Sequence, residues 1–409
     1  MNDTIFIIFY SKQTIIMRLF NYEKLSRSMY SHNIDVILAG TKLNVEYLTD
    51  FEWMKGFNKD NFLLEDGENY AASFVGLPID ENTGPFYVAP STQTGYPENY
   101  QMWIKDIRYW GPVFFVSGSE SQIDSADNPI ERVAQVLYEK NLDKGRIGVE
   151  WRHLEMKFAE DLREFLPMAT LVDAEPILWD LRMVKSEEEI IRIRKASDIT
   201  SEVINSIYEE VAFEGMSEWD LEHYLGVAFA ERGSRHLWTD IGFGPKGANF
   251  VGPTNQLLKK GEILRIDASG WWNGYVSDQS RSLAWDGEIS DEAKKAHASI
   301  LRMNKKLRDS VRPGILPSDL YLLTMKMFEE EGYESLTPQA GHSLGRTVHE
   351  PPFLVKGSNK PLEPGMIVVV EPTMRVQGVG SINIEDTTLV TEDGCESLTS
   401  SPREWDAFL

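Results

Sequence analysis

The 409-residue sequence has only one cysteine and no long hydrophobic run. A single thiol, Cys395, cannot form an internal disulfide, which is compatible with the reducing conditions of the cytoplasm. No stretch of about 18 apolar residues is present to cross a membrane. The short apolar segment 5–10 lacks the preceding basic residues of a signal peptide. The sequence therefore predicts a cytoplasmic protein.

Positive charge is also scarce. The chain has 41 Lys and Arg residues against 64 Asp and Glu residues, so its formal net charge is -23 at pH 7. Nucleic acids and anionic membranes attract basic surfaces, so this acidic balance argues against both as partners. We therefore expect a small peptide or small-molecule substrate, with no nucleic acid and no membrane partner.

The chain is long enough for two domains. Between residues 22 and 172, helical patterns alternate with short apolar runs, which is typical of an α/β domain. Here we expect a buried strand at residues 34–39, continued into the first sheet by residues 44–51. Ser186 with Glu189 forms a capping box that opens a later helix, and Ser217 with Asp220 opens a second one. We predict an N-terminal extension at 1–17, a first domain at 18–178 and a second at 179–409.

A hairpin with one carboxylate on each arm is the central feature of the second domain. Asn273-Gly274 predicts its two-residue turn, because both turn positions need a positive φ. In the ideal register Asp278 lies opposite Ser269, and Asp267 is its diagonal neighbour at about 7 Å between Cα atoms. Two carboxylates this close repel each other unless a cation lies between them.

Three downstream segments add further residues of the types that bind metals. They are GHSLGRTVHEPP with His342 and His349, MIVVVEPTM with Glu371, and SINIEDTTLV with Glu385. Carboxylates with one imidazole are ligands that Mn, Fe, Co or Zn accept, often as a pair of bridged ions. Any one of these acids could be an ordinary surface group, but together they predict a metal site.

These motifs resemble the pita-bread metallohydrolase family of methionine aminopeptidase, prolidase, aminopeptidase P and creatinase. The Gly-His-x-x-Gly-x-x-x-His-Glu-x-Pro run, the Glu-Pro and the Ile-Glu-Asp are all present. Residues 44–51 and 182–186 are similar to two further motifs of prolidases. The resemblance implies an α/β N-terminal domain, an α+β C-terminal pita-bread domain with a curved antiparallel sheet and helices outside, and a homodimer.

The resemblance also implies a role for each candidate residue. Two divalent ions (Mn, Co, Fe or Zn) would be held by five ligands, with Glu371 acting also as the general base for a metal-bridged hydroxide. His349 would bind the substrate carbonyl and its developing negative charge. Phe250 and Asn383 would also line the substrate site. The five implied metal ligands are Asp267, Asp278, His342, Glu371 and Glu385.

Two positions depart from the family pattern. Phe250 stands where the peptidases have a histidine, and a phenyl ring can neither donate nor accept a proton. Asn383 stands where prolidase and aminopeptidase P have an arginine, and an amide does not replace that charge. These departures favour a non-peptidase enzyme of the same fold, similar to creatinase, ectoine hydrolase or dimethylsulfoniopropionate lyase.

Three functions therefore stay open. The intact ligand set and the His349-Glu350 pair favour a dinuclear metallohydrolase acting on Xaa-Pro peptides, as a dipeptidase or an aminopeptidase. The second is the non-peptidase enzyme. The third is a catalytically silent binding protein, which the retained ligand residues argue against.

Overall fold

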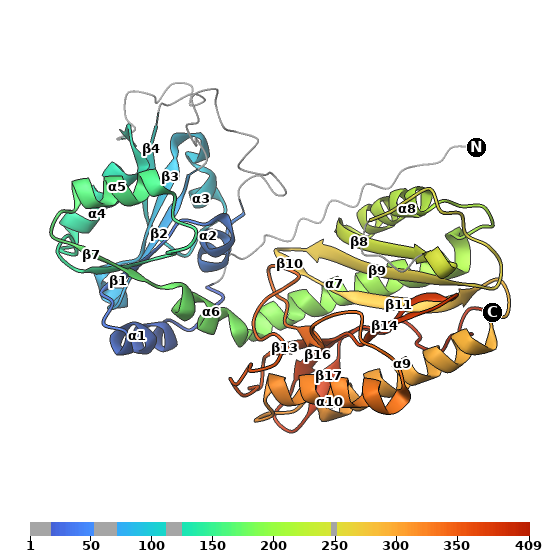
Figure 1. Ribbon diagram of the computed structural model, residues 1–409. Helices are drawn as coiled ribbons and strands as arrows, with labels where there is room; N and C mark the ends of the chain where they lie inside the picture. The colour runs from blue at the N-terminus through green and yellow to red at the C-terminus, as the bar shows by residue number, and fades with distance from the viewer. Residues whose placement is uncertain (1–17, 53–71, 112–124, 247–251) are drawn as a thin grey trace, which may run out of the picture. The chain divides into compact units, whose positions relative to one another are not determined.

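The computed structural model describes residues 18–52, 72–111, 125–246 and 252–409 (Figure 1). The expected extension 1–17 and the candidate residue Phe250 lie outside these ranges. The chain divides into two compact units, Met1–Leu181 and Arg182–Leu409. In the described ranges, no helix has both the length and the apolar character needed to span a membrane.

The first unit is built on a mixed seven-stranded sheet in the order β5-β4-β3-β2-β1-β6-β7. The β1–β2 and β2–β3 pairs are antiparallel, and the other four pairs are parallel. The strands are β1 Val36–Ala39, β2 Phe74–Pro78, β3 Phe86–Pro90, β4 Asp106–Trp110, β5 Ser125–Ala126, β6 Arg146–Val149 and β7 Thr170–Asp173.

Helices cover this sheet as the amphipathic patterns predict. Ile130, Val133 and Leu137 of α4 are fully buried against strand residues, together with Leu162 of α5. Figure 1 shows these two helices lying side by side over the sheet. The helices of this unit are α1 Tyr22–Ser31, α2 Lys42–Thr49, α3 Tyr96–Asn99, α4 Pro129–Glu139, α5 Met156–Phe165 and α6 Glu175–Met183.

The expectation that residues 44–51 continue the first sheet is wrong, because this segment forms helix α2. The Thr41 hydroxyl caps the helix by accepting a hydrogen bond from the Asn44 amide. The Glu150 carboxylate accepts hydrogen bonds from the Gly40 and Thr41 amides at 2.7 and 2.8 Å. This buried carboxylate satisfies donors that a strand would have paired, so the chain turns into a helix after β1.

The second unit contains only antiparallel strand pairs among its described residues, in three sheets. One sheet has the order β10-β9-β11 with β8 also paired to β9, a second has the order β12-β13-β16-β17, and a third is the β14–β15 pair. The strands are β8 Arg235–Phe243, β9 Glu262–Trp272, β10 Tyr275–Val276, β11 Gln279–Trp285, β12 Gly341–His342, β13 Ile367–Val370, β14 Thr373–Val376, β15 Gly380–Asn383, β16 Asp386–Val390 and β17 Cys395–Ser397.

Four long helices pack outside these sheets (Figure 1). Both predicted helix starts are confirmed, and the structure has a capping box at Ser186 and at Ser217. Two of the helices bury their apolar faces against Leu264, Ile266 and Ala268 of β9, and a third packs on β14 and β15. The predicted fold class is confirmed. The helices are α7 Glu187–Ser206, α8 Glu218–Glu231, α9 Asp291–Ser310 and α10 Pro317–Glu331.

The predicted hairpin and its register are also confirmed. Asn273 and Gly274 have φ values of 47° and 87°, as the two-residue turn requires. Tyr275 pairs with Trp272, and Gln279 pairs with Ala268. The same register places Asp278 opposite Ser269, so Asp267 and Asp278 are diagonal neighbours.

Candidate metal centre

Strands of the second unit and their ends bring the five predicted ligand residues to one region. Glu371 directly follows the buried β13, and Glu385 forms an isolated bridge with Ser280 just before β16. His342 follows Gly341, where a Cβ atom would lie 2.0 Å from the Val369 carbonyl oxygen, so only glycine allows β12 to approach β13 this closely. The remaining two residues are Asp267 in β9 and Asp278 between β10 and β11.

The ligand atoms converge around the His342 imidazole. Its Nε2 atom lies 3.6 Å from Asp278 Oδ2, 3.7 Å from Glu371 Oε1 and 4.0 Å from Glu385 Oε1. Asp278, His342 and Glu385 each offer an atom to a group whose members lie within 4.8 Å of one another. Asp267 belongs to the same cluster, because its negative charge adds to the effect of burial in raising the pKa values of Asp278, Glu371 and Glu385.

The chemistry of these atoms fits a metal ion. The Nδ1 atom of His342 lies 3.0 Å from the Ser343 carbonyl oxygen, so an Nδ1–H donor leaves the Nε2 lone pair facing the carboxylates. Buried polar atoms in proteins are rarely left without a partner. Within the described part of the chain, four buried atoms of this cluster have no hydrogen-bond partner: Asp267 Oδ1, Asp278 Oδ1, His342 Nε2 and Glu385 Oε2.

The raised pKa values of the clustered carboxyl groups also favour a bound cation. Burial raises the pKa of Asp267 to about 7 and that of Glu371 to about 8, and neighbouring carboxylates add to the rise. The pKa values of Asp278 and Glu385 are raised in the same way. Burial lowers the pKa of His342 to about 3, so the imidazole is neutral and able to bind a metal. A divalent cation would allow all four carboxylates to ionise.

Two further side chains, His349 and Gln339, lie beside the cluster. The His349 ring is exposed, and its centroid lies 4.3 Å from that of His342. The Gln339 side-chain amide donates a hydrogen bond of 2.9 Å to Glu371 Oε1. Sequence reasoning missed Gln339, whose only signal is its place three residues before His342.

The loop that carries both histidines is organised around the Glu350 carboxylate. Glu350 forms a buried ion pair with Arg182, and Lys185 Nζ lies 3.7 Å from its Oε2 atom. The Glu350 Oε1 atom also accepts a hydrogen bond of 2.9 Å from the Arg346 amide. Backbone hydrogen bonds of 3.0 and 2.8 Å between Ser343 and Glu350 close the base of the loop. The 182–186 motif thus braces the loop, a role that the sequence alone did not reveal.

A second acid, Asp386, directly follows the ligand Glu385 but faces another environment. Its carboxylate pairs with Arg281 and Arg403 at 2.8 Å and with Arg308 at 3.3 Å. These guanidinium groups hold the pKa of Asp386 far below its usual range, against the effect of burial. Arg281 is therefore a structural ion-pair partner of Asp386.

Asn383 lies beside Asp267, a candidate metal ligand. Its side chain is 1% exposed, and its amide nitrogen is 3.5 Å from Asp267 Oδ2. Its backbone amide donates to the Ser282 hydroxyl at 2.9 Å, which fixes β15 against β11. Asn383 therefore contacts a candidate metal ligand, whereas a contact with substrate stays a prediction.

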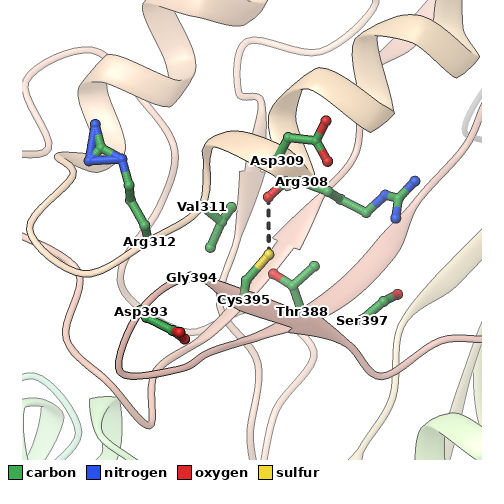
Figure 2. Close-up of a pocket in the computed structure, with 9 residues that line it drawn as sticks. All are labelled: Arg308, Asp309, Val311, Arg312, Thr388, Asp393, Gly394, Cys395 and Ser397. Carbon is green, nitrogen blue, oxygen red and sulfur yellow. Dashed lines mark hydrogen bonds between the residues drawn. The ribbon is translucent and has the colours of Figure 1, made fainter.

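A separate cavity of about 350 Å³ lies between the end of α9 and β17 and shares no residue with the metal cluster (Figure 2). Within it the Cys395 thiol donates a hydrogen bond of 3.0 Å to the Arg308 carbonyl oxygen. Burial raises the pKa of this thiol, so Cys395 is protonated and is not a nucleophile.

Two family models match the chain. Residues 22–184 match the Creatinase/Prolidase N-terminal domain, and residues 191–392 match metallopeptidase family M24. A Xaa-Pro dipeptidase of Pyrococcus horikoshii is 28% identical over 346 residues, which cover 81% of this chain and 94% of that protein.

Solved structures show the same fold. A Xaa-Pro dipeptidase from Bacillus anthracis matches with a TM-score of 0.78 and 23% identity, over 93% of this chain and 97% of that one. A prolidase from Pyrococcus horikoshii matches with a TM-score of 0.76 and 22% identity, over 94% and 99% of the two chains. These structures show the fold, and the two family models show that the chain belongs to metallopeptidase family M24 and carries a creatinase/prolidase N-terminal domain.

Proposed function

We propose that this protein is a Xaa-Pro peptidase, a dipeptidase or an aminopeptidase, that works with two divalent cations. The observation that carries the proposal is the convergence of buried carboxylate oxygens on His342 Nε2, where four buried atoms have no hydrogen-bond partner among the described residues. The proposed ligands are Asp267, Asp278, His342, Glu371 and Glu385. Four carboxylates and one imidazole suit Mn, Co, Fe or Zn, and the excess of oxygen ligands favours manganese.

The proposed chemistry follows from these residues. When bound, the cations supply a Lewis acid that lowers the pKa of the attacking water and polarises the substrate carbonyl. Glu371 accepts the proton of this water and passes it to the leaving nitrogen. Gln339 holds the Glu371 carboxylate in place through its 2.9 Å hydrogen bond. His349, exposed beside His342, donates a hydrogen bond to the carbonyl oxygen as negative charge develops there.

The Xaa-Pro specificity is supported by the similar proteins. The relative of Pyrococcus horikoshii and the structure from Bacillus anthracis both carry the name Xaa-Pro dipeptidase. Phe250, His349 and Asn383 are the proposed substrate-contacting residues. We further propose a homodimer in the cytoplasm, which the resemblance and the single Cys395 support.

The metal site is tested by metal analysis of the purified protein. We expect two divalent ions per chain in the wild type, and Asp278→Ala or Glu385→Ala should lose both ions or most of the occupancy, because each change removes a carboxylate that lies beside His342 Nε2. The exposed acid Glu334, changed to alanine, is the matched control and should keep both ions. Full occupancy in both ligand variants would contradict the proposed site.

The reaction is tested with a substrate panel. We expect hydrolysis of Xaa-Pro dipeptides or of longer peptides with proline in the second position. Asn383 specifically favours the alternative, because its amide contacts Asp267 without supplying the charge of an arginine. Ectoine, creatine and dimethylsulfoniopropionate therefore complete the panel. Turnover of one of these compounds without any peptide hydrolysis would assign the protein to the non-peptidase enzymes.

A further inference from the structure

A buried ion pair joins β8 to β9, the strand that carries the proposed ligand Asp267. The Arg265 guanidinium donates a hydrogen bond of 2.7 Å from Nη2 to Asp240 Oδ2. Arg265 is 1% exposed and Asp240 is 3% exposed. Taking two charges out of water is costly, so such a pair is weak evidence for stability and needs another explanation.

The pair lies beside Asp267 on the same face of the sheet. Arg265 and Asp267 are two residues apart in β9, so their side chains point to the same side. Asp240 of β8 is directly opposite Asp267 in the strand register. Arg265 is opposite Gly242, which has no side chain, and this leaves room for the guanidinium to reach Asp240. The alternate residues of β9, including Leu264 and Ile266, face the apolar core on the other side.

Asn383 approaches this face from the opposite edge. Its backbone amide is bound by Ser282, the residue that pairs with Arg265 across β11 and β9. Its side-chain amide reaches Asp267 Oδ2 at the long distance of 3.5 Å. An amide contributes a dipole, whereas a guanidinium contributes a full charge and a rigid fork of donors. Asp267 is therefore flanked by a neutral amide on one side and by the Arg265–Asp240 pair on the other.

We propose that Arg265 is a positioning residue for the metal centre, held in place by Asp240 and acting on Asp267. It brings to the site from β9 the positive charge that Asn383 does not supply from β15. The pair fixes the direction of the guanidinium, and the guanidinium in turn places a positive charge on the face of the sheet that carries Asp267. This inference rests on the proposed role of Asp267 as a ligand.

The test measures metal binding without turnover. Co²⁺ is titrated into metal-free protein and followed by calorimetry and by its visible absorption. The variant combines Arg265→Met with Asp240→Asn, which removes both charges and leaves neither one unpaired. Loss of a residue that supports a ligand typically weakens metal affinity by about 10- to 100-fold. We expect a loss in this range, and we expect Asn383→Arg added to the same variant to restore much of the affinity.

Two controls make the result specific. Arg132→Met removes a buried arginine of the first unit and should leave Co²⁺ affinity unchanged. If the Arg265→Met pair does not fold by circular dichroism, Arg265→Gln with Asp240→Asn replaces it, because two amides can still hydrogen-bond. Unchanged affinity in a folded variant, or a loss that Asn383→Arg does not restore, would overturn the proposal. A wild type that takes up no Co²⁺ would instead overturn the proposed function.

Discussion

The imidazole rings of His342 and His349 lie edge to face, with centroids 4.3 Å apart and planes inclined by 60°. Only one of the two rings is buried, because His342 is 1% exposed while His349 faces solvent. The proposed function therefore gives the two histidines of this short loop separate tasks. The buried ring would bind a metal, and the exposed ring would contact the substrate.

Replacing His349 should separate these tasks. We expect His349→Ala to keep its metal ions and to lose about 10²- to 10³-fold in kcat, the usual effect of removing one donor to a developing oxyanion. His342→Ala should lose metal as well as activity. Metal analysis and steady-state kinetics on the same samples check this, and loss of metal from the His349 variant would contradict it.

The Glu371 carboxylate has two proposed roles, which one conservative change can distinguish. We expect Glu371→Gln to lower turnover by at least about 10²-fold, because an amide cannot accept the proton of the attacking water. Gln339→Leu removes the hydrogen bond to Glu371 Oε1 and should give a smaller loss with the metal content unchanged. Near-normal turnover of metal-loaded Glu371→Gln would exclude the general-base role.

The buried ion pairs of Glu350 with Arg182 and Lys185 should contribute strongly to the stability of the fold. Breaking a buried ion pair by removing one partner typically costs about 3–5 kcal/mol. Glu350→Gln leaves Arg182 and Lys185 without their carboxylate, so we expect a destabilisation of this order in chemical denaturation. The exposed pair Arg194–Glu396 provides the matched control, and Glu396→Gln should cost less than about 1 kcal/mol.

His297 should make stability depend on pH. Burial lowers its pKa from 6.5 to about 4, so the folded protein resists protonation that the unfolded chain accepts. Above pH 6.5 neither state is protonated at this residue and the full stability is present. As the pH falls from 6.5 towards 4, the contribution of His297 to unfolding free energy decreases by about 1.4 kcal/mol per pH unit.

The measurement compares wild type with His297→Asn in urea at pH 7.5 and pH 5. Both proteins share the carboxylates of the metal centre, so the difference between them isolates the histidine. We expect the wild type to lose more stability than the variant on acidification. Equal losses would show that His297 is not the group responsible.

Local sequence signals predicted much of this structure. The Asn273-Gly274 turn and the capping boxes at Ser186 and Ser217 act through neighbouring residues, so their patterns are readable along the chain. The identity of helix α2 was missed, because it depends on Glu150, more than a hundred residues away from Thr41.

The convergence of the five candidate ligand residues was predictable because their residue types and order match a known pattern. The residues that support the candidate ligands could not be predicted, because each of them contacts a partner that is distant in the sequence. Arg182 reaches Glu350 across 168 positions, and Arg265 reaches Asp240 across 25. Nothing in the sequence marks such residues as paired until the strands are placed side by side.

The ion pairs of Asp386 have a consequence for the neighbouring residue Glu385. Successive side chains of an extended chain point in opposite directions, so anchoring Asp386 on one side fixes Glu385 on the other. The Arg281 guanidinium pairs with the Asp386 carboxylate and also donates a hydrogen bond of 2.7 Å to the Glu385 carbonyl oxygen. The direction of the Glu385 side chain is therefore set by ion pairs and hydrogen bonds of the protein itself.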